Sequence, residues 1–269
     1  MAAGLSLIFG LMDVVNFAHG EMLMLAMYGA VVVFGLTGLD PLLQLPLVCG
    51  AMFLLGVSVY RGLIARALSV RFNKGMVQIF ATFGLAIFIR GAAQYVFGGD
   101  FKSVSGTWLS GRTVHVGEVY APLPQVAAGV VCLLAFAGLL LVGRTAFGRA
   151  LEATREDREA VALIGIDRDR IFSLGWGLGV ATVGVAGAML VSFYYVTPNV
   201  GANFAIIAYV TVALGGFGSI LGALAAGVLI GEVEAVTALV LEPSVKQVGM
   251  FVVYLAVLTV RPRGLFGSL

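Results

Sequence analysis

Charged residues are scarce in this chain of 269 residues: they make up 11% of it, whereas 60% is hydrophobic. A soluble domain carries about 25% charged residues, so this chain could not cover its own surface in water. Apolar stretches such as VAAGVVCLLAFAGLLLVG recur throughout and are long enough to span a bilayer as helices. The composition therefore excludes a soluble globular protein. It predicts an all-α, polytopic transmembrane bundle that forms a single domain over residues 1–269.

Residue patterns for catalysis or metal binding are also missing. The two cysteines, Cys49 and Cys132, lie inside apolar runs without metal or disulfide spacing, and the two histidines are His19 and His115. The chain has neither a G-x-x-x-x-G-K-[ST] nucleotide loop nor a G-x-S-x-G elbow. No basic leader precedes the first apolar residues, so no signal peptide is expected. We expect no enzymatic activity, no metal, no cofactor and no nucleic-acid partner.

The apolar segments differ in length. They cover Met1–Val15, Met22–Leu36, Leu42–Tyr60, Met76–Phe97, Leu123–Val142, Ile171–Val196, Phe204–Leu214, Ile220–Leu239 and Val245–Val260. A helix needs about 20 residues to cross the apolar core of a bilayer. The first, second and seventh segments are shorter than this. We therefore expect about eight or nine hydrophobic segments, with broken or re-entrant helices at the short ones.

Basic residues predict the orientation. Of the 16 lysines and arginines, 12 lie in three segments, at residues 61–74, 144–170 and 261–263. The positive-inside rule assigns these segments to the cytoplasm. The opposite side then receives a periplasmic loop at residues 98–122, the segment 197–203 and the turn at Glu242-Pro243.

Glycine is abundant, at 37 residues, and several glycines are four residues apart. Small residues at this spacing let helix backbones approach closely in lipid, which predicts tight packing within the bundle. The pairs are Gly175 with Gly179, Gly218 with Gly222, and Gly227 with Gly231. The denser LGGFGSILGA stretch (Leu214–Ala223) predicts an unwound turn, and transporters tend to build substrate sites at such interruptions.

The stretch NFAHGE (Asn16–Glu21) places polar groups between two apolar runs, where burial is expensive. Two interpretations are open. In one, these groups face a cavity or a transport path. In the other, Asn16 or His19 caps a helix and Glu21 complements its positive end.

Three further ionisable residues lie inside apolar segments. Arg90 is expected to reach the outer membrane interface with its long side chain. Glu232 and Glu234 are expected to present a polar face to a partner subunit.

The segment 144–171 is densely charged, with both signs balanced. Attraction to anionic lipid explains such a balance poorly, whereas a short charged helix between two spans is a natural docking surface for a cytoplasmic protein. Within it, the stretch EAVALIG begins with a charged residue and continues with the apolar residues Val161, Leu163 and Ile164. These apolar side chains could fill a groove in a partner. A solvated loop is the open alternative.

Four stretches, in order and over nearly the whole chain, resemble the permease subunits of branched-chain amino-acid ABC importers, the LivH/LivM family. They are GLSLIFGLMDVVNFAHGEMLMLAMYGA, GRALEATREDREAVALIGIDRDRI, TPNVG and LGGFGSILGALAAGVLIGEVEA. The resemblance implies the ABC importer permease fold, with a helix broken near NFAHG, in the bacterial plasma (inner) membrane. It also implies a second homologous permease subunit, two cytoplasmic ATPase subunits that bind the ATP, a periplasmic substrate-binding protein and surrounding membrane lipid.

Candidate functional residues fall into two groups. The candidates for the translocation path are Asn16, Phe17, His19, Gly20, Glu21, Gly215, Gly216 and Gly218. The candidates for coupling to the ATPase, within a cytoplasmic loop at residues 143–171, are Glu152, Arg155, Glu159, Ala160 and Gly165.

The chain departs from the family pattern in three places. Relatives carry about 20 residues, one helical segment, before GLSLIFG, so an upstream extension is expected to improve assembly. Relatives often have a basic residue at the position of Ile207 and an apolar one at Glu232. These differences leave the substrate open between branched-chain amino acids and urea or short amides. A stand-alone, ion-coupled secondary transporter with Asp13, His19 and Glu232 as a proton relay is the rival class.

Overall fold

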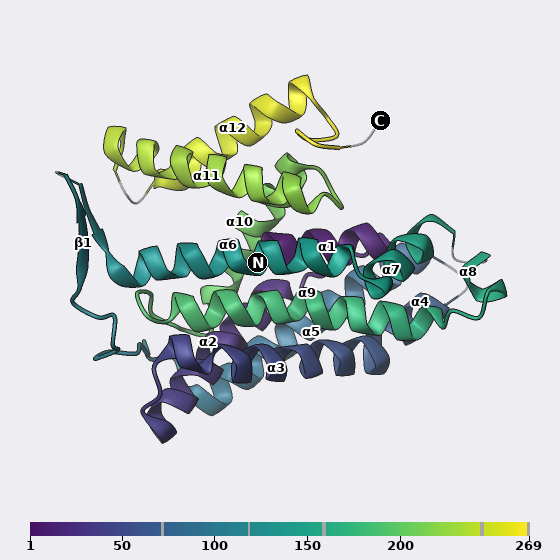
Figure 1. The fold of residues 1–269 in the computed structure, drawn as a ribbon, viewed down its shortest axis with the longest axis horizontal. Helices are drawn as coiled ribbons and strands as arrows, with labels where there is room; N and C mark the ends of the chain where they lie inside the picture. Colours follow the sequence, from purple (N-terminus) through teal and green to yellow (C-terminus); the bar gives the residue numbers. More distant parts are fainter. Residues whose placement is uncertain (71–72, 118, 158–159, 243–244, 268–269) are drawn as a thin grey trace.

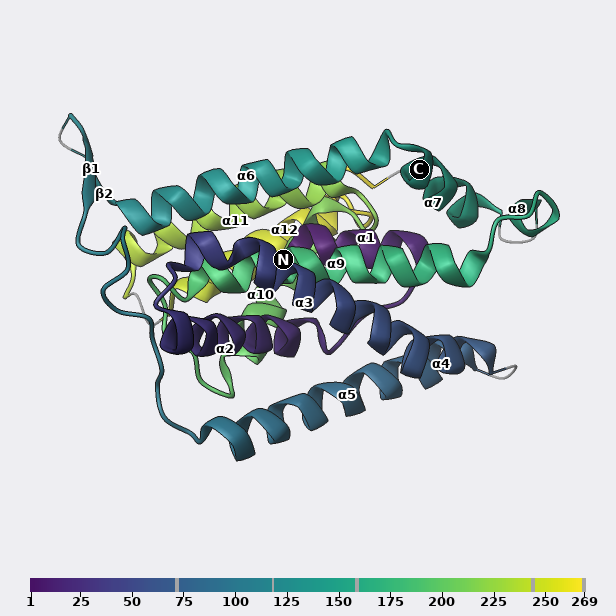
Figure 2. The same ribbon diagram turned by 60° about the horizontal axis from the view of Figure 1, so that its bottom comes forward.

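Helices that run along the long axis of the molecule dominate the computed structural model (Figures 1 and 2). The structure describes residues 1–70, 73–117, 119–157, 160–242 and 245–267. Arg71, Arg158, Glu159 and Pro243, which entered the predictions above, lie outside the described residues. The elements are α1 (Ala2–Met12), α2 (His19–Thr37), α3 (Pro41–Val59), the π-helix η1 (Tyr60–Ile64), α4 (Ala65–Ser69), α5 (Lys74–Phe97), β1 (Thr113–Val116), β2 (Val119–Pro122), α6 (Leu123–Gly143), α7 (Ala146–Glu156), α8 (Ala160–Leu163), α9 (Arg168–Leu190), α10 (Val200–Gly215), α11 (Ile220–Val240) and α12 (Lys246–Val260).

Several helices begin where a polar side chain can satisfy a free backbone N–H group. Asp40 accepts a hydrogen bond from the Leu42 amide (2.9 Å) at the start of α3, where Pro41 follows. Thr145, Asp167 and Ser219 cap α7, α9 and α11 in the same way. These caps set the boundaries of the segment from α7 to α9 and of the glycine turn, two of the regions that carry candidate residues.

Six helices among the described residues are long and apolar enough to cross a membrane: α2, the continuous run Pro41–Ser69, α5, α6, α9 and α11. The prediction of short first and seventh segments is confirmed, because α1 has 11 residues and α10 has 16. The prediction for the second segment is wrong. Helix α2 begins at His19 and has 19 residues, because His19, Gly20 and Glu21, which hydropathy excludes from the segment, are helical and buried. The last helix, α12, is short as well, with 15 residues.

The basic segments gather at one end of the molecule. Helices α4, α7 and α8 lie at this end, and the β1–β2 hairpin lies at the opposite end (Figures 1 and 2). Lys102, in the loop 98–122, exchanges two backbone hydrogen bonds with Val196 (3.0 and 2.8 Å). Val196 immediately precedes the segment 197–203, so the two segments assigned to the outer side lie at the same end of the molecule.

Helix α9 forms the centre of the core and packs against α1, α2, α3 and α6. Gly179 lies so close to Gly4 and Ile8 of α1 that neither glycine has space for a Cβ atom. Gly177 packs against α3 at Phe53 and Val57. The predicted close packing at Gly175 and Gly179 is confirmed.

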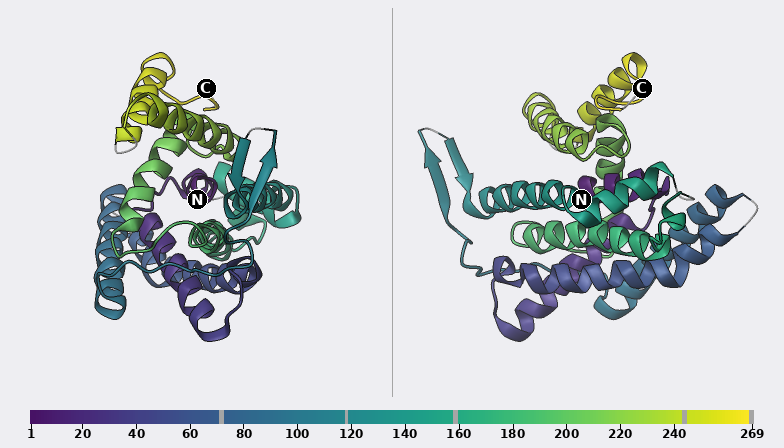
Figure 3. Two further views of the ribbon diagram at one scale, coloured as in Figure 1. Left: turned by 90° about the vertical axis from the view of Figure 1, so that its left-hand side faces the viewer. Right: turned by 45° about the vertical axis from the view of Figure 1, so that its right-hand side comes forward.

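Helices α11 and α12 pack against each other beside the other helices, and α10 joins the two groups (Figure 3). Here the glycine prediction is wrong for one pair: Gly231 has no neighbour within 4 Å of a Cβ position, and Gly227 has one distant contact. Glu232 is exposed, whereas Glu234 forms an ion pair with Lys246 of α12 (3.5 Å). Glu234 thus joins two helices of this chain, and the expected polar face toward a partner subunit stays a prediction.

Candidate functional site

An interrupted helix lies in the core of the molecule. Helix α1 ends at Met12, where Asp13 takes a left-handed conformation (φ 54°), and α2 begins only at His19. The His19 ring donates a hydrogen bond through Nε2 to the Met1 carbonyl (3.1 Å), so the start of α2 lies beside the start of α1. Residues 13–18 must therefore run back along α1, which is about 16 Å long, and six extended residues cover that distance.

The backbone of this break is satisfied by side chains from two distant helices. Gln78 of α5 donates to the Asp13 carbonyl (3.2 Å), and Thr82 of α5 donates to the Val15 carbonyl (3.3 Å). Tyr209 of α10 donates to the Asn16 carbonyl (2.8 Å). Non-helical backbone at membrane depth is tolerated only where protein or a water-filled cavity replaces these hydrogen bonds. The break is thus built into the fold.

Sequence reasoning did not select Gln78, Thr82 or Tyr209 as functional residues. The available signal was the placement of single polar residues in apolar helices, in MVQIFATFGL and AYVTVALGG. Hydropathy averages hide such residues, and their common partner becomes visible only when α5 and α10 are placed on either side of residues 13–18.

The capping interpretation of NFAHGE is not supported for Asn16 or His19. Ala18 occupies the N-cap position of α2, without a side-chain hydrogen bond from the cap residue. The Asn16 side chain instead accepts a hydrogen bond from the Ala18 amide (3.1 Å) and closes the turn that precedes the helix. Asn16 and His19 are both fully buried. His19 Nδ1 has no hydrogen-bond partner within the described chain.

Glu21 and Arg90 form an ion pair between α2 and α5. Nε and Nη2 of Arg90 both donate to Oε1 of Glu21, so Arg90 has a charged partner within the chain, which the sequence did not predict. The Glu21 side chain is 3% exposed and that of Arg90 is 38% exposed. Oε2 of Glu21 has no hydrogen-bond partner among the described residues. It lies beside the first turn of α10, 2.7 Å from the position of a Cβ on Gly201.

Two other residues of the motif fix how α2, α5 and α10 meet. Gly20 and Gly201 are in direct backbone contact, and neither has space for a Cβ atom. Phe17 is half-buried, with its ring centre 6.4 Å from that of Phe83 on α5 and 5.6 Å from that of Tyr209 on α10. Asn16, Phe17, His19, Gly20 and Glu21 therefore form one site between α5 and α10.

A polar cavity of about 230 Å³ lies at the C-terminal end of α5 and the N-terminal end of α10. Its lining residues are Gln94, Gly99, Phe101, Tyr194, Tyr195, Thr197, Pro198, Asn199, Val200 and Asn203. Gln94 lies one helical turn beyond Arg90 on α5, and Val200 precedes Gly201 at the start of α10. The cavity and the Glu21–Arg90 pair thus share the first turn of α10.

The glycine turn lies elsewhere. Gly216 and Gly218 have positive φ angles (98° and 82°), which glycine adopts without strain. The C-terminal tail covers this turn, because the amides of Leu265 and Phe266 donate to the carbonyls of Leu214 and Gly215 (2.8 and 3.1 Å). The structure therefore does not bring Gly215, Gly216 and Gly218 to the NFAHGE site.

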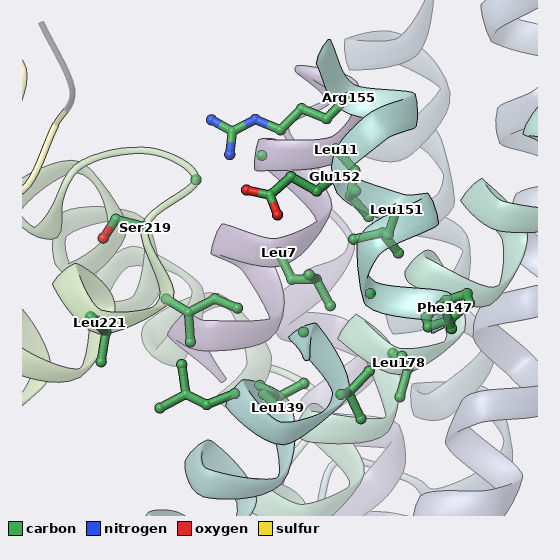
Figure 4. A pocket seen from close by; sticks show the side chains of 17 residues that line it. Leu7, Leu11, Leu139, Phe147, Leu151, Glu152, Arg155, Leu178, Ser219 and Leu221 are labelled. Carbon is green, nitrogen blue, oxygen red and sulfur yellow. The ribbon is translucent and has the colours of Figure 1, made fainter. Parts of the chain in front are cut away.

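The glycine turn instead meets helix α7. Nη2 of Arg155 is 3.2 Å from the Cβ position of Gly218, and Gly218 also contacts Gly10 of α1. Figure 4 shows Glu152 and Arg155 pointing from α7 over a cavity of about 310 Å³ toward the segment that contains Ser219. Leucine side chains from α1, α6, α7, α9 and α11 line this cavity.

The segment after α7 presents an apolar tip. Leu163 and Ile164 are 88% and 74% exposed, whereas Val161 is buried and cannot belong to the expected hydrophobic knob. Ala160 begins the short helix α8, and Gly165 ends it with a positive φ of 83°. Glu159 lies outside the described residues.

The interrupted helix and the six membrane-spanning helices define a polytopic membrane protein of the transporter class. Residues 1–259 match the family model of the branched-chain amino acid transport system / permease component, and the chain belongs to this family. Its membership and its helices make it a multi-pass protein of the plasma (inner) membrane.

Three relatives illustrate the range of similarity. The high-affinity branched-chain amino acid transport system permease protein BraD of Pseudomonas aeruginosa is 30% identical over 278 residues, which cover 99% of this chain and 90% of BraD. LivH of Escherichia coli K12, of the same description, is 29% identical over 279 residues, with the same coverage. The autoinducer 2 import system permease protein LsrC of Yersinia enterocolitica is 28% identical over 176 residues, 62% of this chain and 47% of LsrC. No solved structure matches the chain.

Proposed function

We propose that this chain is the permease subunit of an ATP-binding-cassette importer and forms the path for branched-chain amino acids. The observation that carries this proposal is the interrupted helix. Its polar motif is buried at membrane depth between α5 and α10, in a chain whose relatives BraD and LivH carry branched-chain amino acid transport in their names. A buried break of this kind is where transporters present backbone and polar side chains to a substrate.

In this proposal the chain is not an enzyme, and ATP is bound by partner subunits. The proposed complex contains a second homologous permease, two cytoplasmic ATPases and a periplasmic binding protein. The surface for the ATPase is the segment from α7 to Gly165. Its support is the exposed tip at Leu163 and Ile164, together with the contact of Arg155 with the glycine turn. Movement of α7 would then reach the α10–α11 junction directly.

The rival proposal of an ion-coupled transporter requires Asp13, His19 and Glu232 to pass protons between them. Glu232 is exposed on the peripheral helix α11, whereas His19 is buried and its Nε2 is bonded to the Met1 carbonyl. This separation between exposed and buried members disfavours a relay, because proton transfer needs a chain of groups within hydrogen-bond reach.

The test is reconstitution of the permease with the ATPases and the binding protein encoded by neighbouring genes. Proteoliposomes are loaded with ATP or with a non-hydrolysable analogue and supplied with labelled leucine, isoleucine, valine, urea or acetamide. We expect leucine-type uptake only with ATP, and the same rate after an ionophore collapses ion gradients. Uptake without ATP that the ionophore abolishes would establish the secondary transporter. ATP-driven uptake of urea or acetamide alone would establish the amide permease.

A further inference from the structure

The carboxylate of Glu21 is held from one side only. Oε1 accepts two hydrogen bonds from the Arg90 guanidinium, while Oε2 is buried without a hydrogen-bond partner in the described part of the chain. A buried acceptor atom left unpaired is costly and calls for an explanation such as a ligand. Oε2 faces the start of α10 at Gly201, where the N-terminal end of the helix favours negative charge.

Arg90 also retains capacity for a second anion. Its side chain is partly exposed, and its planar guanidinium has five N–H donors, of which only those on Nε and Nη2 bond to Glu21. The polar cavity begins one helical turn further along α5, at Gln94, and reaches the first turn of α10, at Val200 and Asn203. Glu21 and Arg90 do not line this cavity, but each lies next to residues that do. Arg90 is one helical turn from Gln94, and Glu21 contacts Gly201 beside Val200.

We propose that Glu21 and Arg90 recognise the ammonium and the carboxylate of an amino-acid zwitterion as it leaves this cavity. The inference rests on the proposed function and specifies which part of the substrate is recognised. The substrate carboxylate takes free donors of Arg90, and the substrate ammonium donates to Oε2 of Glu21. The side chain of the amino acid is then free to contact the apolar surroundings.

Charge balance gives this arrangement its selectivity. The free site is neutral, because one cation faces one anion. A zwitterion adds one charge of each sign, and each of its charges faces the residue of opposite charge. A solute with a single charge would leave a net charge in the apolar zone, which is strongly unfavourable. A neutral amide such as urea offers neither residue an ionic partner. The site therefore discriminates against both classes and favours amino acids.

The experiment uses the reconstituted complex with its binding protein and compares Arg90→Gln and Glu21→Gln with a matched control. Lys246→Gln removes a different interhelical ion pair, the one with Glu234 between α12 and α11. We expect Arg90→Gln and Glu21→Gln each to lower ATP-driven leucine uptake at least about tenfold. Stimulation of the ATPase by the binding protein persists, and Lys246→Gln transports within about twofold of the wild type.

A charge swap distinguishes recognition from a purely structural pair. Glu21→Arg combined with Arg90→Glu restores an ion pair but reverses its direction, so uptake stays low. Restored uptake, or unchanged uptake in Arg90→Gln, overturns the inference and leaves the pair as a link between α2 and α5. If the swap is not recovered from membranes, Arg90→Lys decides: it keeps the ion pair but not the planar fork of donors. Loss of uptake in Arg90→Lys supports recognition, and wild-type uptake refutes it. Wild-type vesicles that take up no amino acid would refute the proposed function instead.

Discussion

Gly20 of α2 and Gly201 of α10 touch through their backbones, with the carbonyl of each glycine against the α carbon region of the other. This contact brings the start of α2 to the start of α10. It places the Glu21 carboxylate beside the first turn of α10. Two helices can approach this closely only where both lack a Cβ atom.

Replacement of Gly20 by leucine is expected to abolish transport while membrane insertion stays intact. The added side chain separates α2 from α10 at the proposed path, whereas the apolar character that drives insertion increases. The measurement is uptake in vesicles, with the amount of inserted protein determined by immunoblot. Gly29→Leu, on the same helix, is the matched control, because a Cβ at Gly29 meets nothing within 4 Å. Normal uptake by Gly20→Leu would show that the motif is not part of the path.

Replacement of Gly179 by leucine is expected to destabilise the core. A Cβ at this position collides with Ile8 of α1, and overpacking of this kind costs about 1–3 kcal/mol. Gly231→Leu, on the open face of α11, is expected to be neutral or slightly stabilising, since leucine is the better helix former. Thermal unfolding in detergent compares the two variants. Equal Tm values would contradict the central role of the α1–α9 contact.

Replacement of Tyr209 by phenylalanine removes one of two donors to the Asn16 carbonyl and leaves the His19 amide (3.1 Å) as the other. The free energy of unfolding is expected to fall by about 0.5–1.5 kcal/mol, because a buried hydrogen bond between α10 and the break is lost. Tyr95→Phe is the control, since Tyr95 lies on α5 with its side chain 92% exposed. Unfolding by titration with a denaturing detergent measures both variants. The same stability for both would mean that the His19 amide alone satisfies the Asn16 carbonyl.

Replacement of Leu163 by serine is expected to uncouple ATP hydrolysis from transport. The exposed side chain loses its apolar contact with the proposed ATPase, so uptake falls while basal ATP hydrolysis persists. Leu239→Ser is the control: Leu239 is similarly exposed, at 87%, but lies at the end of α11 remote from α7. Stimulated ATPase rate and uptake are measured in the same vesicles. Full coupling in Leu163→Ser would leave this segment as a solvated loop.

The apolar run lengths predicted most of the helices, because crossing a bilayer imposes a minimum length on any sequence. The error at α2 has a physical cause. His19, Gly20 and Glu21 are polar or small, so hydropathy places the start of the segment at Met22. The contacts with Arg90 and Gly201 nevertheless make the burial of these residues favourable. Glu21 and Arg90, whose charges compensate each other, are 69 residues apart, so the pair leaves no local pattern in the sequence.

Glycine spacing predicted contact but not its location. Gly175 and Gly179 have the same separation as Gly227 and Gly231, but only the first pair faces other helices of this chain. The spacing shows that one face of a helix consists of small residues. Which neighbour meets that face depends on the order in which the helices are arranged, and this order is a property of the whole fold.

The hydrogen bonds of residues 13–18 have a consequence for biosynthesis. Their donors, Gln78, Thr82 and Tyr209, are synthesised about 65 to 193 residues later than the carbonyls they serve. The Asn16 carbonyl also accepts a hydrogen bond from the nearby His19 amide, whereas the Asp13 and Val15 carbonyls accept theirs from side chains of α5. Until α5 has emerged from the ribosome, these two carbonyls must remain in contact with water or with the insertion machinery, because lipid cannot satisfy them. A ribosome stalled before α5 should therefore leave this segment accessible to water-soluble reagents.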